Sequence, residues 1–271
     1  MVFQKSIPAK NLPLKIGSTD MKPYWKVVEN IICQSDIVLE VLDARMPELS
    51  RNQEIEAMAV RFNKPLVLIL NKADLVSQPN LRKMFRKYQM QYSVFIISSK
   101  EKIGTKRLRE FLFNKSKNRN NFKIGVVGYP NTGKSSVINK IALRKKAKVT
   151  STAGTTHGEQ WINAGNNIQI LDSPGVIPIK ENDEIRLALI GSRNIEKIKR
   201  LDIVAHTIIM LFEDKTPIEK LYNIQAKSDN PQEIIQKIGR AKNYVKRGSL
   251  VDETRTEIQI IRDWQSGKLR L

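Results

Sequence analysis

The sequence predicts an α/β fold with a mainly parallel sheet, followed by an all-helical domain. In residues 1–180, short runs rich in Val, Ile and Leu alternate with segments whose apolar residues have helical spacing. From residue 181 onward the strand-like runs vanish and helix-like segments follow one another. Apolar strands that alternate with helices are typical of a doubly wound sheet covered on both faces. We therefore expect one domain over residues 1–180 and a second, helical domain over residues 181–271.

Strands and helices are expected to alternate along the first domain. The expected strands are DIVLEVLD from residue 36, PLVLIL at 65–70, SVFIISS at 93–99, FKIGVVG at 122–128 and a hairpin within 159–175 that turns at AGNN. The expected helices are NQEIEAMAVRFN, LRKMFRKYQ, TKRLREFLF and SSVINKIAL. In the second domain, helices are expected in NDEIRLALIG, DIVAHTIIMLF, NPQEIIQKIGRAKNYVKRG and DETRTEIQIIRDWQ, with Asp or Asn at their caps.

Length and composition exclude several classes of protein. A chain of 271 residues with 41% hydrophobic content can form a packed core. No apolar run approaches the ~20 residues that span a bilayer, and the first residues lack the apolar centre of a signal peptide. The single cysteine, Cys33, cannot form an intrachain disulfide, so we expect a reducing, cytoplasmic location. Because Cys33 lies among Ile31, Ile32 and Ile37, we expect it to be buried.

Positive charge is concentrated in one segment. The formal net charge is +20, and residues 76–150 contain 19 Lys or Arg but only 2 Asp or Glu. The basic clusters of this segment are LRKMFRK, KIGTKRLRE, NKSKNRNN and LRKKAKV. Solvated basic faces are common and often serve only solubility. An excess of this size repels itself unless a polyanion neutralises it, so we expect a nucleic-acid partner.

A glycine-rich motif follows the strand expected at 122–128. Residues 128–135 match GxxxxGKS and lead into the expected helix SSVINKIAL. In this context glycines allow backbone NH groups to surround phosphates, Lys134 reaches the terminal phosphates and the Ser135 hydroxyl can ligate Mg²⁺. The phosphate-binding residues expected here are Asn131, Thr132, Gly133, Lys134, Ser135 and Ser136.

Two further stretches can complete a phosphate and metal site. Asp172 ends the strand IQILD, where a carboxylate would hold Mg²⁺ through water, and Gly175 of DSPG can contact a γ-phosphate through its NH. AGTTH offers Thr155 and Thr156, and one of these hydroxyls can complete the metal shell. Taken alone, DSPG is most often a turn.

The motif NKAD, residues 71–74, indicates which base is bound. An ionised Asp74 accepts from the N1–H and exocyclic amine of guanine, whereas adenine would leave this carboxylate unpaired. SSK, residues 98–100, would add a backbone NH to guanine O6, although in isolation it fits an ordinary Ser-rich strand end better. The residues expected to bind the base are Asn71, Lys72, Asp74, Ser98, Ser99 and Lys100.

These motifs occur in the order NKAD, SSK, GYPNTGKSS, TT and DSPG. An ordinary GTPase runs from the phosphate loop through Thr and DxxG to NKxD, so one order is a rotation of the other. A sheet tolerates such a rotation when the original ends are joined and the new ends lie at the surface. We expect NKSKNRNN, residues 114–121, to be the joining loop.

With this motif order the sequence closely resembles the circularly permuted GTPases of the YlqF/RbgA type, which are related to Era and take part in ribosome assembly. The resemblance covers nearly the whole chain, from DIVLEVLDARMP through LNKADLV, VGYPNTGKSSVIN and DSPGVI to GSLVDETRTEIQIIRDWQSGKL. It implies a P-loop GTPase sheet with permuted motif order. It also implies that Thr156 is the switch threonine, that Asp172 and Gly175 form the second switch, and that NKAD recognises guanine.

The resemblance bears on hydrolysis as well. The catalytic candidates are Lys134, Thr156 and Asn131. Val and Ile follow DSPG where many GTPases have a glutamine that orients water, so we expect a low intrinsic rate. Similar GTPases with an apolar residue there often use K⁺, held partly by an Asn that Asn131 matches, but an αL-tolerant loop residue accounts for Asn131 equally well. GSTDMK lacks the N-terminal His of bacterial relatives, so we assign no general base, and His157 is only a weak candidate.

The expected function is that of a GTP-hydrolysing factor that binds rRNA or the precursor of the large ribosomal subunit and assists its assembly. The alternative is an RNA-binding scaffold with a nearly inert guanine-nucleotide site. Intact Lys134, Ser135 and Asp172 favour the first, and the missing glutamine favours the second. GTP-dependent tRNA modification lacks support, because no additional catalytic residue is visible. We expect a monomer, and an archaeal source fits the composition. Because DSPG leads straight into the second domain, we expect nucleotide state to be transmitted there.

Overall fold

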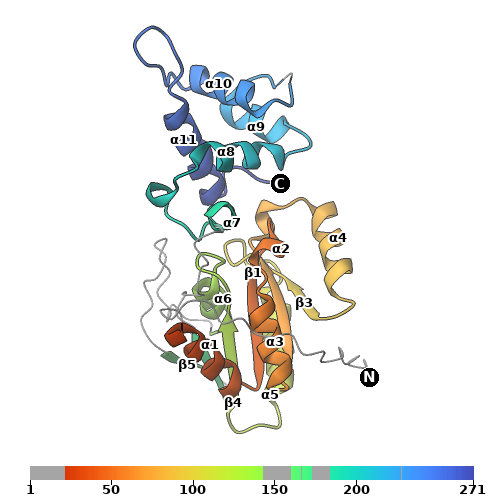
Figure 1. Cartoon of the computed structure of the whole chain (residues 1–271). Coiled ribbons are helices and arrows are strands. Elements are labelled where there is room, and N and C mark those ends of the chain that lie inside the picture. The colour runs from red at the N-terminus through yellow and green to blue at the C-terminus, as the bar shows by residue number, and fades with distance from the viewer. Residues whose placement is uncertain (1–21, 143–159, 166, 173–183, 227) are drawn as a thin grey trace.

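A six-stranded sheet organises the first part of the chain, and a group of helices lies beyond one end of it (Figure 1). The computed structural model describes residues 22–142, 160–165, 167–172, 184–226 and 228–271. The strand order is β3-β2-β1-β4-β6-β5. The prediction of an α/β sheet followed by helices is confirmed.

The strands are short and apolar. They are β1 (Ile37–Asp43), β2 (Leu66–Asn71), β3 (Ser93–Ile96), β4 (Phe122–Val127), β5 (Gln160–Gly165) and β6 (Ile168–Asp172). All neighbours pair in parallel except β5, which forms the expected antiparallel hairpin with β6. Asp43, the last residue of β1, pairs with Asn71, the last residue of β2. The carboxyl ends of these two strands therefore lie side by side.

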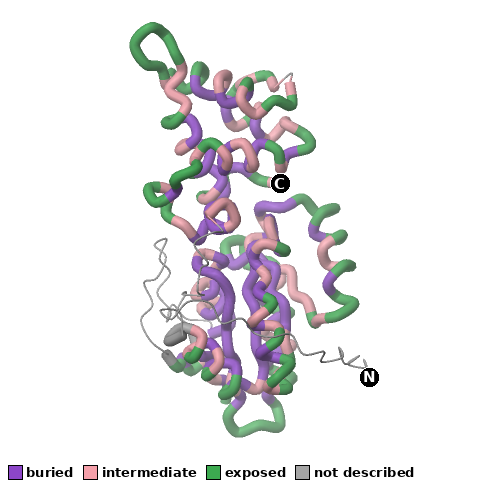
Figure 2. Tube along the Cα trace, viewed as in Figure 1, coloured by how far each residue is buried: buried purple, intermediate pink, exposed green. Residues whose placement is uncertain are grey.

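Helices cover both faces of the sheet. The helices of this part are α1 (Lys22–Gln34), α2 (Pro47–Ser50), α3 (Gln53–Arg61), α4 (Gln78–Tyr88), α5 (Thr105–Ser116) and α6 (Lys134–Ile141). The α1 and α3 helices share a core with Val38 of β1, whereas α5 and α6 share the opposite core with Leu39 and Val41. This alternation follows from the two-residue period of a strand. The central strands are accordingly buried along their length (Figure 2).

The second part of the chain is helical. Its helices are α7 (Glu184–Leu189), α8 (Leu201–Met210), α9 (Thr216–Tyr222), α10 (Pro231–Ala241) and α11 (Glu253–Ser266). Trp264 is fully buried in their core, with the Phe212 ring edge-on to it. As predicted, Asn230 and Asp252 cap α10 and α11 by accepting backbone NH groups. Among the described helices, none is both long and apolar enough to cross a lipid bilayer.

Several element boundaries differ from the sequence prediction. The sequence prediction omits both α9 and α1. Apolar residues of α1 lie four residues apart, which is the spacing of a helix. The α10 helix ends at Ala241 instead of extending toward residue 248, because Asn243 is left-handed and Val245 bridges to Val251. The run NKSKNRNN is not all loop, since α5 continues to Ser116. Residues 117–121 of that run are exposed, as a joining loop requires.

The prediction that Cys33 is buried is wrong. Its side chain is exposed, whereas Ile31 and Ile32 are fully buried. Successive residues of a helix are about 100° apart around its axis. The face of α1 that packs on the sheet therefore includes the two isoleucines and excludes Cys33.

Candidate functional site

The predicted motifs gather at the carboxyl ends of β1, β2 and β4. The β1 and β4 strands are neighbours, but α3 follows β1 onto one face of the sheet and α6 follows β4 onto the other. Such a switch point opens a crevice at the carboxyl ends of the strands, where open α/β sheets bind ligands. The phosphate motif leaves β4 at this crevice, and NKAD leaves β2 beside it.

Two glycines shape the phosphate loop between β4 and α6. Gly128 has a φ of 142° and Gly133 a φ of 97°, a range that other residues rarely adopt. A Cβ at Gly128 would lie 2.5 Å from the Val41 carbonyl oxygen, and one at Gly133 would lie 2.2 Å from Asn71 Nδ2. Lys134 Nζ donates to two carbonyl oxygens at the start of the loop, at 2.8 and 2.9 Å. The loop thus curls tightly into the N-terminus of α6, where NH groups and the helix dipole favour an anion.

Asn71 joins the base motif to the phosphate loop. Its Nδ2 donates to the Thr132 carbonyl oxygen at 2.9 Å. Its Oδ1 accepts from the NH of Ser99 at 3.2 Å and from the Ser99 hydroxyl at 3.0 Å. The side chain is buried, so these bonds are shielded from water. One amide therefore fixes NKAD, SSK and the phosphate motif relative to one another.

Lys72 and Asp74 lie on the loop that follows β2. Lys72 has a left-handed backbone with a φ of 64°, and Asp74 belongs to a 3₁₀ turn, Ala73–Leu75. Asp74 Oδ1 accepts from the Ser98 hydroxyl at 2.6 Å. The carboxylate predicted to bind guanine is therefore oriented by the SSK segment.

A buried ion cluster holds Lys72. Asp43 is fully buried and accepts from Lys72 Nζ at 2.8 Å and from Arg45 Nη2 at 2.8 Å. Burial alone would raise the pKa of Asp43, but the charges and hydrogen bonds of Lys72 and Arg45 outweigh burial and hold that pKa well below its usual range. Burial lowers the pKa of Lys72, and the charge of Asp43 partly opposes this shift. The Asp43 carboxylate is therefore ionised at neutral pH.

Asn131 contacts the helical part of the chain. Its φ of 59° makes it a left-handed loop residue, and its side-chain amide donates to the Gly191 carbonyl oxygen. The carbonyl oxygen of Pro130 accepts from the Ser192 hydroxyl at 2.6 Å. The turn that follows α7 therefore touches the phosphate loop directly.

The remaining predicted residues lie near the ends of α6, β3 and β6 or outside the described residues. Ser135 and Ser136 occupy the first turn of α6 and are half-buried, and Lys100 is exposed after β3. Asp172 ends β6 and pairs with Val126 of β4, so its backbone lies beside the strand that leads into the phosphate loop. The predicted switch residues Thr155, Thr156, His157, Gly175, Val176 and Ile177 lie outside the described residues.

Comparison with known proteins decides the family. A family model described as RsgA GTPase matches residues 21–180, and one described as 50S ribosome-binding GTPase matches residues 123–240. A protein named ribosome biogenesis GTPase A, from Bacillus pumilus, is 30% identical over 250 residues, which are 86% of this chain and 88% of the relative. The chain belongs to the circularly permuted GTPases of the YlqF/RbgA type.

Other similar proteins are named as GTP-binding proteins or share the fold. An uncharacterized GTP-binding protein of Methanocaldococcus jannaschii is 38% identical over 251 residues, which are 91% of this chain but 66% of the relative. The chain spans 53% of each of two eukaryotic relatives. The fold is that of GNP-bound YlqF from T. maritima, with a TM-score of 0.60 at 23% identity over 92% of this chain and 95% of that one.

Sequence reasoning missed four residues that contact the motifs. Asp43 and Arg45 support Lys72, and Gly191 and Ser192 contact the phosphate loop. A signal for Asp43 exists, because a carboxylate that ends an apolar strand falls at the edge of the sheet where NKAD is expected. Gly191 and Ser192 carry no local signal, since only the packing of α7 brings them to the loop.

Proposed function

We propose that this YlqF/RbgA-type chain binds GTP at the crevice between β1 and β4 and hydrolyses it to GDP and phosphate. One observation carries the proposal: the buried Asn71 amide joins NKAD, SSK and the phosphate motif at one place. These motifs lie up to about sixty residues apart in the sequence, and their proximity supports a single site for a base and its phosphates. Membership of a GTPase family supports the same activity.

Each part of the crevice has a role in this proposal. Asp74 and Lys72 recognise guanine, with SSK beside them, and the phosphate loop surrounds the phosphates. Lys134, held by two loop carbonyl oxygens, exchanges these partners for terminal phosphate oxygens. Gly175 contacts the γ-phosphate through its NH, and Thr156 closes the site from the switch segment.

The oxygen donors suit Mg²⁺, which GTPase families generally use. Ser135 lies in the first turn of α6, and Asp172 ends the strand beside β4, which supports a metal site at the phosphate loop. With Thr156 they form the proposed ligand set. When bound, the ion neutralises charge that develops on the phosphate oxygens.

We also propose a K⁺ ion at Asn131, because no glutamine follows DSPG. The test compares GTP turnover in K⁺ and Na⁺ buffers for the wild-type chain and Asn131→Ala. A K⁺ preference that survives in Asn131→Ala would assign Asn131 only its structural contact with Gly191.

The proposed partner is rRNA or the large ribosomal subunit during its assembly. The exposed α4 cations Arg82, Lys83 and Arg86 have no ion-pair partner among the described residues, so a phosphate backbone would neutralise them. Relatives named ribosome biogenesis GTPase A support this partner. We further propose a cytoplasmic monomer whose GTPase domain ends at residue 180 and whose helical domain begins at residue 181.

The alternative is an RNA-binding scaffold with a nearly inert nucleotide site. The intact phosphate loop favours hydrolysis, whereas the missing glutamine favours the scaffold. GTP turnover measured in K⁺ buffer, with and without purified large ribosomal subunits, separates the two. Stimulation by the particles that is lost in Lys134→Ala supports the GTPase. Tight binding of nucleotide and particles with unchanged, negligible turnover supports the scaffold.

A further inference from the structure

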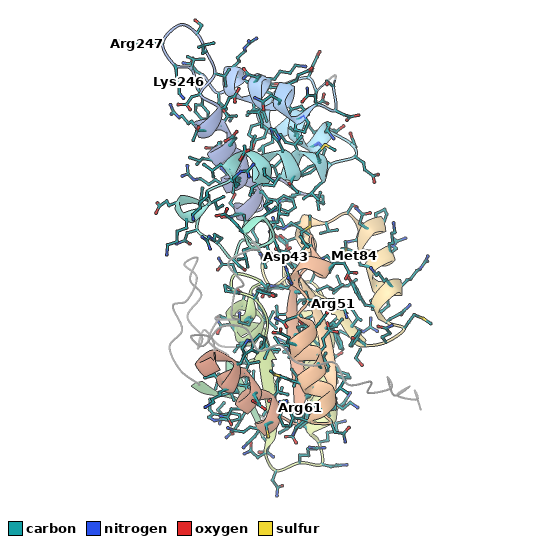
Figure 3. All side chains as sticks on the ribbon, viewed as in Figure 1. Asp43, Arg51, Arg61, Met84, Lys246 and Arg247 are labelled. Carbon is teal, nitrogen blue, oxygen red and sulfur yellow. The ribbon has the colours of Figure 1, made fainter. Side chains whose placement is uncertain are left out.

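We propose that Asp43 and Arg45 are positioning residues of the guanine site: Asp43 fixes the Lys72 ammonium, and Arg45 ties that carboxylate to Trp264 of the helical part. The proposal rests on the guanine site proposed above and names what holds that site in place. Asp43 lies at the end of the sheet nearest the helical part (Figure 3). Both residues come from the DARMP segment that follows the apolar run of β1.

Both carboxylate oxygens of Asp43 are engaged. Oδ2 accepts from Lys72 Nζ and from Arg45 Nη2, each at 2.8 Å. Oδ1 accepts from Arg45 Nε at 3.1 Å and from the Arg45 NH at 3.0 Å. A bidentate guanidinium pair fixes the plane of the carboxylate. The ammonium that shares Oδ2 is therefore held at one position.

This restraint matters because lysine has a long and flexible side chain. An untethered Lys72 would lose rotamer freedom when a nucleotide binds, and that loss would weaken binding. In the structure the Asp43 contact has already removed much of this freedom. Lys72 is also only partly exposed, with 22% of its side chain accessible. Asp43 therefore preorganises the lysine of NKAD before guanine arrives.

Arg45 extends the cluster into the helical part. Its Nη1 donates to the backbone carbonyl oxygen of Trp264, and its guanidinium lies 4.3 Å from the centroid of the Trp264 ring. Trp264 Nε1 in turn donates to the Leu189 carbonyl oxygen at 2.7 Å. A buried guanidinium that loses a partner is costly. Displacing α11 would therefore disturb the pair that holds Lys72.

A second contact joins the helical part to the other side of Asp74. The NH of Leu271 donates to the Leu75 carbonyl oxygen at 2.8 Å, and the Leu271 carbonyl oxygen accepts from the Ser77 NH at 2.6 Å. Gly267 also packs on Leu75, because a Cβ there would lie 2.9 Å from Leu75 Cδ1. The loop that follows β2 is thus held both before and after Asp74. Docking of α11 is therefore coupled to guanine binding.

A double-mutant cycle on GDP affinity tests the link between Asp43 and Lys72. Asp43→Asn removes the charge with little change in shape, and Lys72→Met removes the ammonium. We expect each change to weaken GDP binding about tenfold, and the double variant to bind no more weakly than Lys72→Met. If Asp43→Asn keeps its full effect in the Lys72→Met background, Asp43 does not act through Lys72 and the proposal fails. Absence of GDP binding in the wild-type chain would instead overturn the proposed function.

Glu56→Gln is the matched control for loss of an ion pair. Glu56 pairs with Arg51 at 2.7 Å, is only 13% exposed and contacts none of the nucleotide motifs that the structure describes. We expect this variant to melt at a lower temperature but to bind GDP like the wild type. An equal loss of GDP affinity in Glu56→Gln and Asp43→Asn would mean that general destabilisation, not positioning, explains the effect.

Hydrogen exchange tests the link from Arg45 to α11. Coupling between two sites is reciprocal, so GDP must slow amide exchange around Trp264 if docking of α11 favours guanine binding. Arg45→Lys keeps the charge but cannot form the bidentate pair and also reach the Trp264 carbonyl oxygen. We expect this variant to lose most of the GDP-dependent protection in α11 and to bind GDP several-fold more weakly. Unchanged protection by GDP in Arg45→Lys would overturn the link.

Discussion

Among single residues, Glu40 is unusual because a carboxyl group lies in the middle of a central strand. It is fully buried, Oε1 accepts from the Asn52 NH at 2.8 Å, and Oε2 has no hydrogen-bond partner among the described residues. Burial, with a smaller effect of the nearby Glu56 charge, raises the pKa of Glu40 to about 8. The folded protein therefore holds a proton at neutral pH that the unfolded chain releases.

This proton makes stability depend on pH. Because the folded-state pKa lies above the unfolded one, the contribution of Glu40 is fully present below about pH 4.5 and is lost as pH rises toward 8. Between pH 5.5 and 8 we expect the wild-type chain to lose roughly 3 kcal/mol relative to Glu40→Gln, which carries no titrating group there. Urea unfolding of both chains at the two pH values measures this difference. Parallel pH profiles would show that Glu40 is not the group responsible.

Gly133 is the second residue with unusual surroundings, because they leave no room for a side chain. Gly133→Ala would place a methyl group 2.2 Å from Asn71 Nδ2, in the amide bridge between the base and phosphate motifs. We expect at least a tenfold loss of GDP affinity, measured by titration calorimetry. Gly248→Ala is the control, because Gly248 also has a positive φ of 82° but no described atom within 4 Å of its Cβ position. That variant should lose a little stability and bind GDP normally. If both variants lost GDP affinity equally, backbone strain alone would explain the loss.

At the level of elements, the turn after α7 connects the helices to the phosphate loop. Ser192→Ala removes the bond to the Pro130 carbonyl oxygen and leaves a buried acceptor unsatisfied, so we expect a loss of about 1–3 kcal/mol in unfolding free energy and faster exchange of α7 amides. Ser266→Ala is the control, since among the described residues that hydroxyl bonds only within its own helix, to the Asp263 carbonyl oxygen. Similar exchange in the two variants would mean that the contact does not hold α7 in place.

The elements themselves were largely predictable from the sequence. The β1, β2, β4 and β6 strands follow from apolar runs, and Asn230 and Asp252 follow from capping chemistry. The end of α10 was not predictable from periodicity, because Lys242 and Tyr244 still fit a helix, whereas the chain leaves the helix and Val245 forms an isolated β-bridge with Val251. The exposure of Cys33 was likewise not predictable from its apolar neighbours, because it depends on which face of α1 meets the sheet.

The sequence predicts the motifs of the candidate site and their proximity, but not the individual contacts that join them. Asn71, Ser99 and Thr132 belong to three recognisable motifs, and the permuted order predicts that these motifs meet. That Asn71 supplies the joining contacts, and that Arg45 reaches Trp264, depend on packing between segments far apart in the chain. Such contacts have no local sequence pattern, so only the folded chain reveals them.

For the whole molecule, the position of the basic charge bears on the proposed RNA partner. Part of the charge excess of residues 76–150 lies on α4, where Arg82, Lys83 and Arg86 are exposed and have no ion-pair partner among the described residues. Arg240 and Arg247 in the helical part are likewise exposed and unpaired within the described chain, and Arg247 lies at the tip farthest from the sheet (Figure 3). The pair Arg82 and Arg86 on α4 and the pair Arg240 and Arg247 in the helical part are therefore alternative binding points for RNA phosphates. They differ mainly in location.

Exchanging each pair for alanine distinguishes them. We expect Arg82→Ala with Arg86→Ala to weaken binding to large ribosomal subunits and to reduce the slope of log affinity against log salt by roughly 1.5, because each lost phosphate contact removes about 0.7–0.9. Arg240→Ala with Arg247→Ala removes the same charge and should leave the slope nearly unchanged. Filter-binding assays across a salt series measure both slopes. If the control pair lowers the slope and the α4 pair does not, the part of the helical region that carries Arg240 and Arg247 holds RNA, and the α4 arginines serve solubility instead.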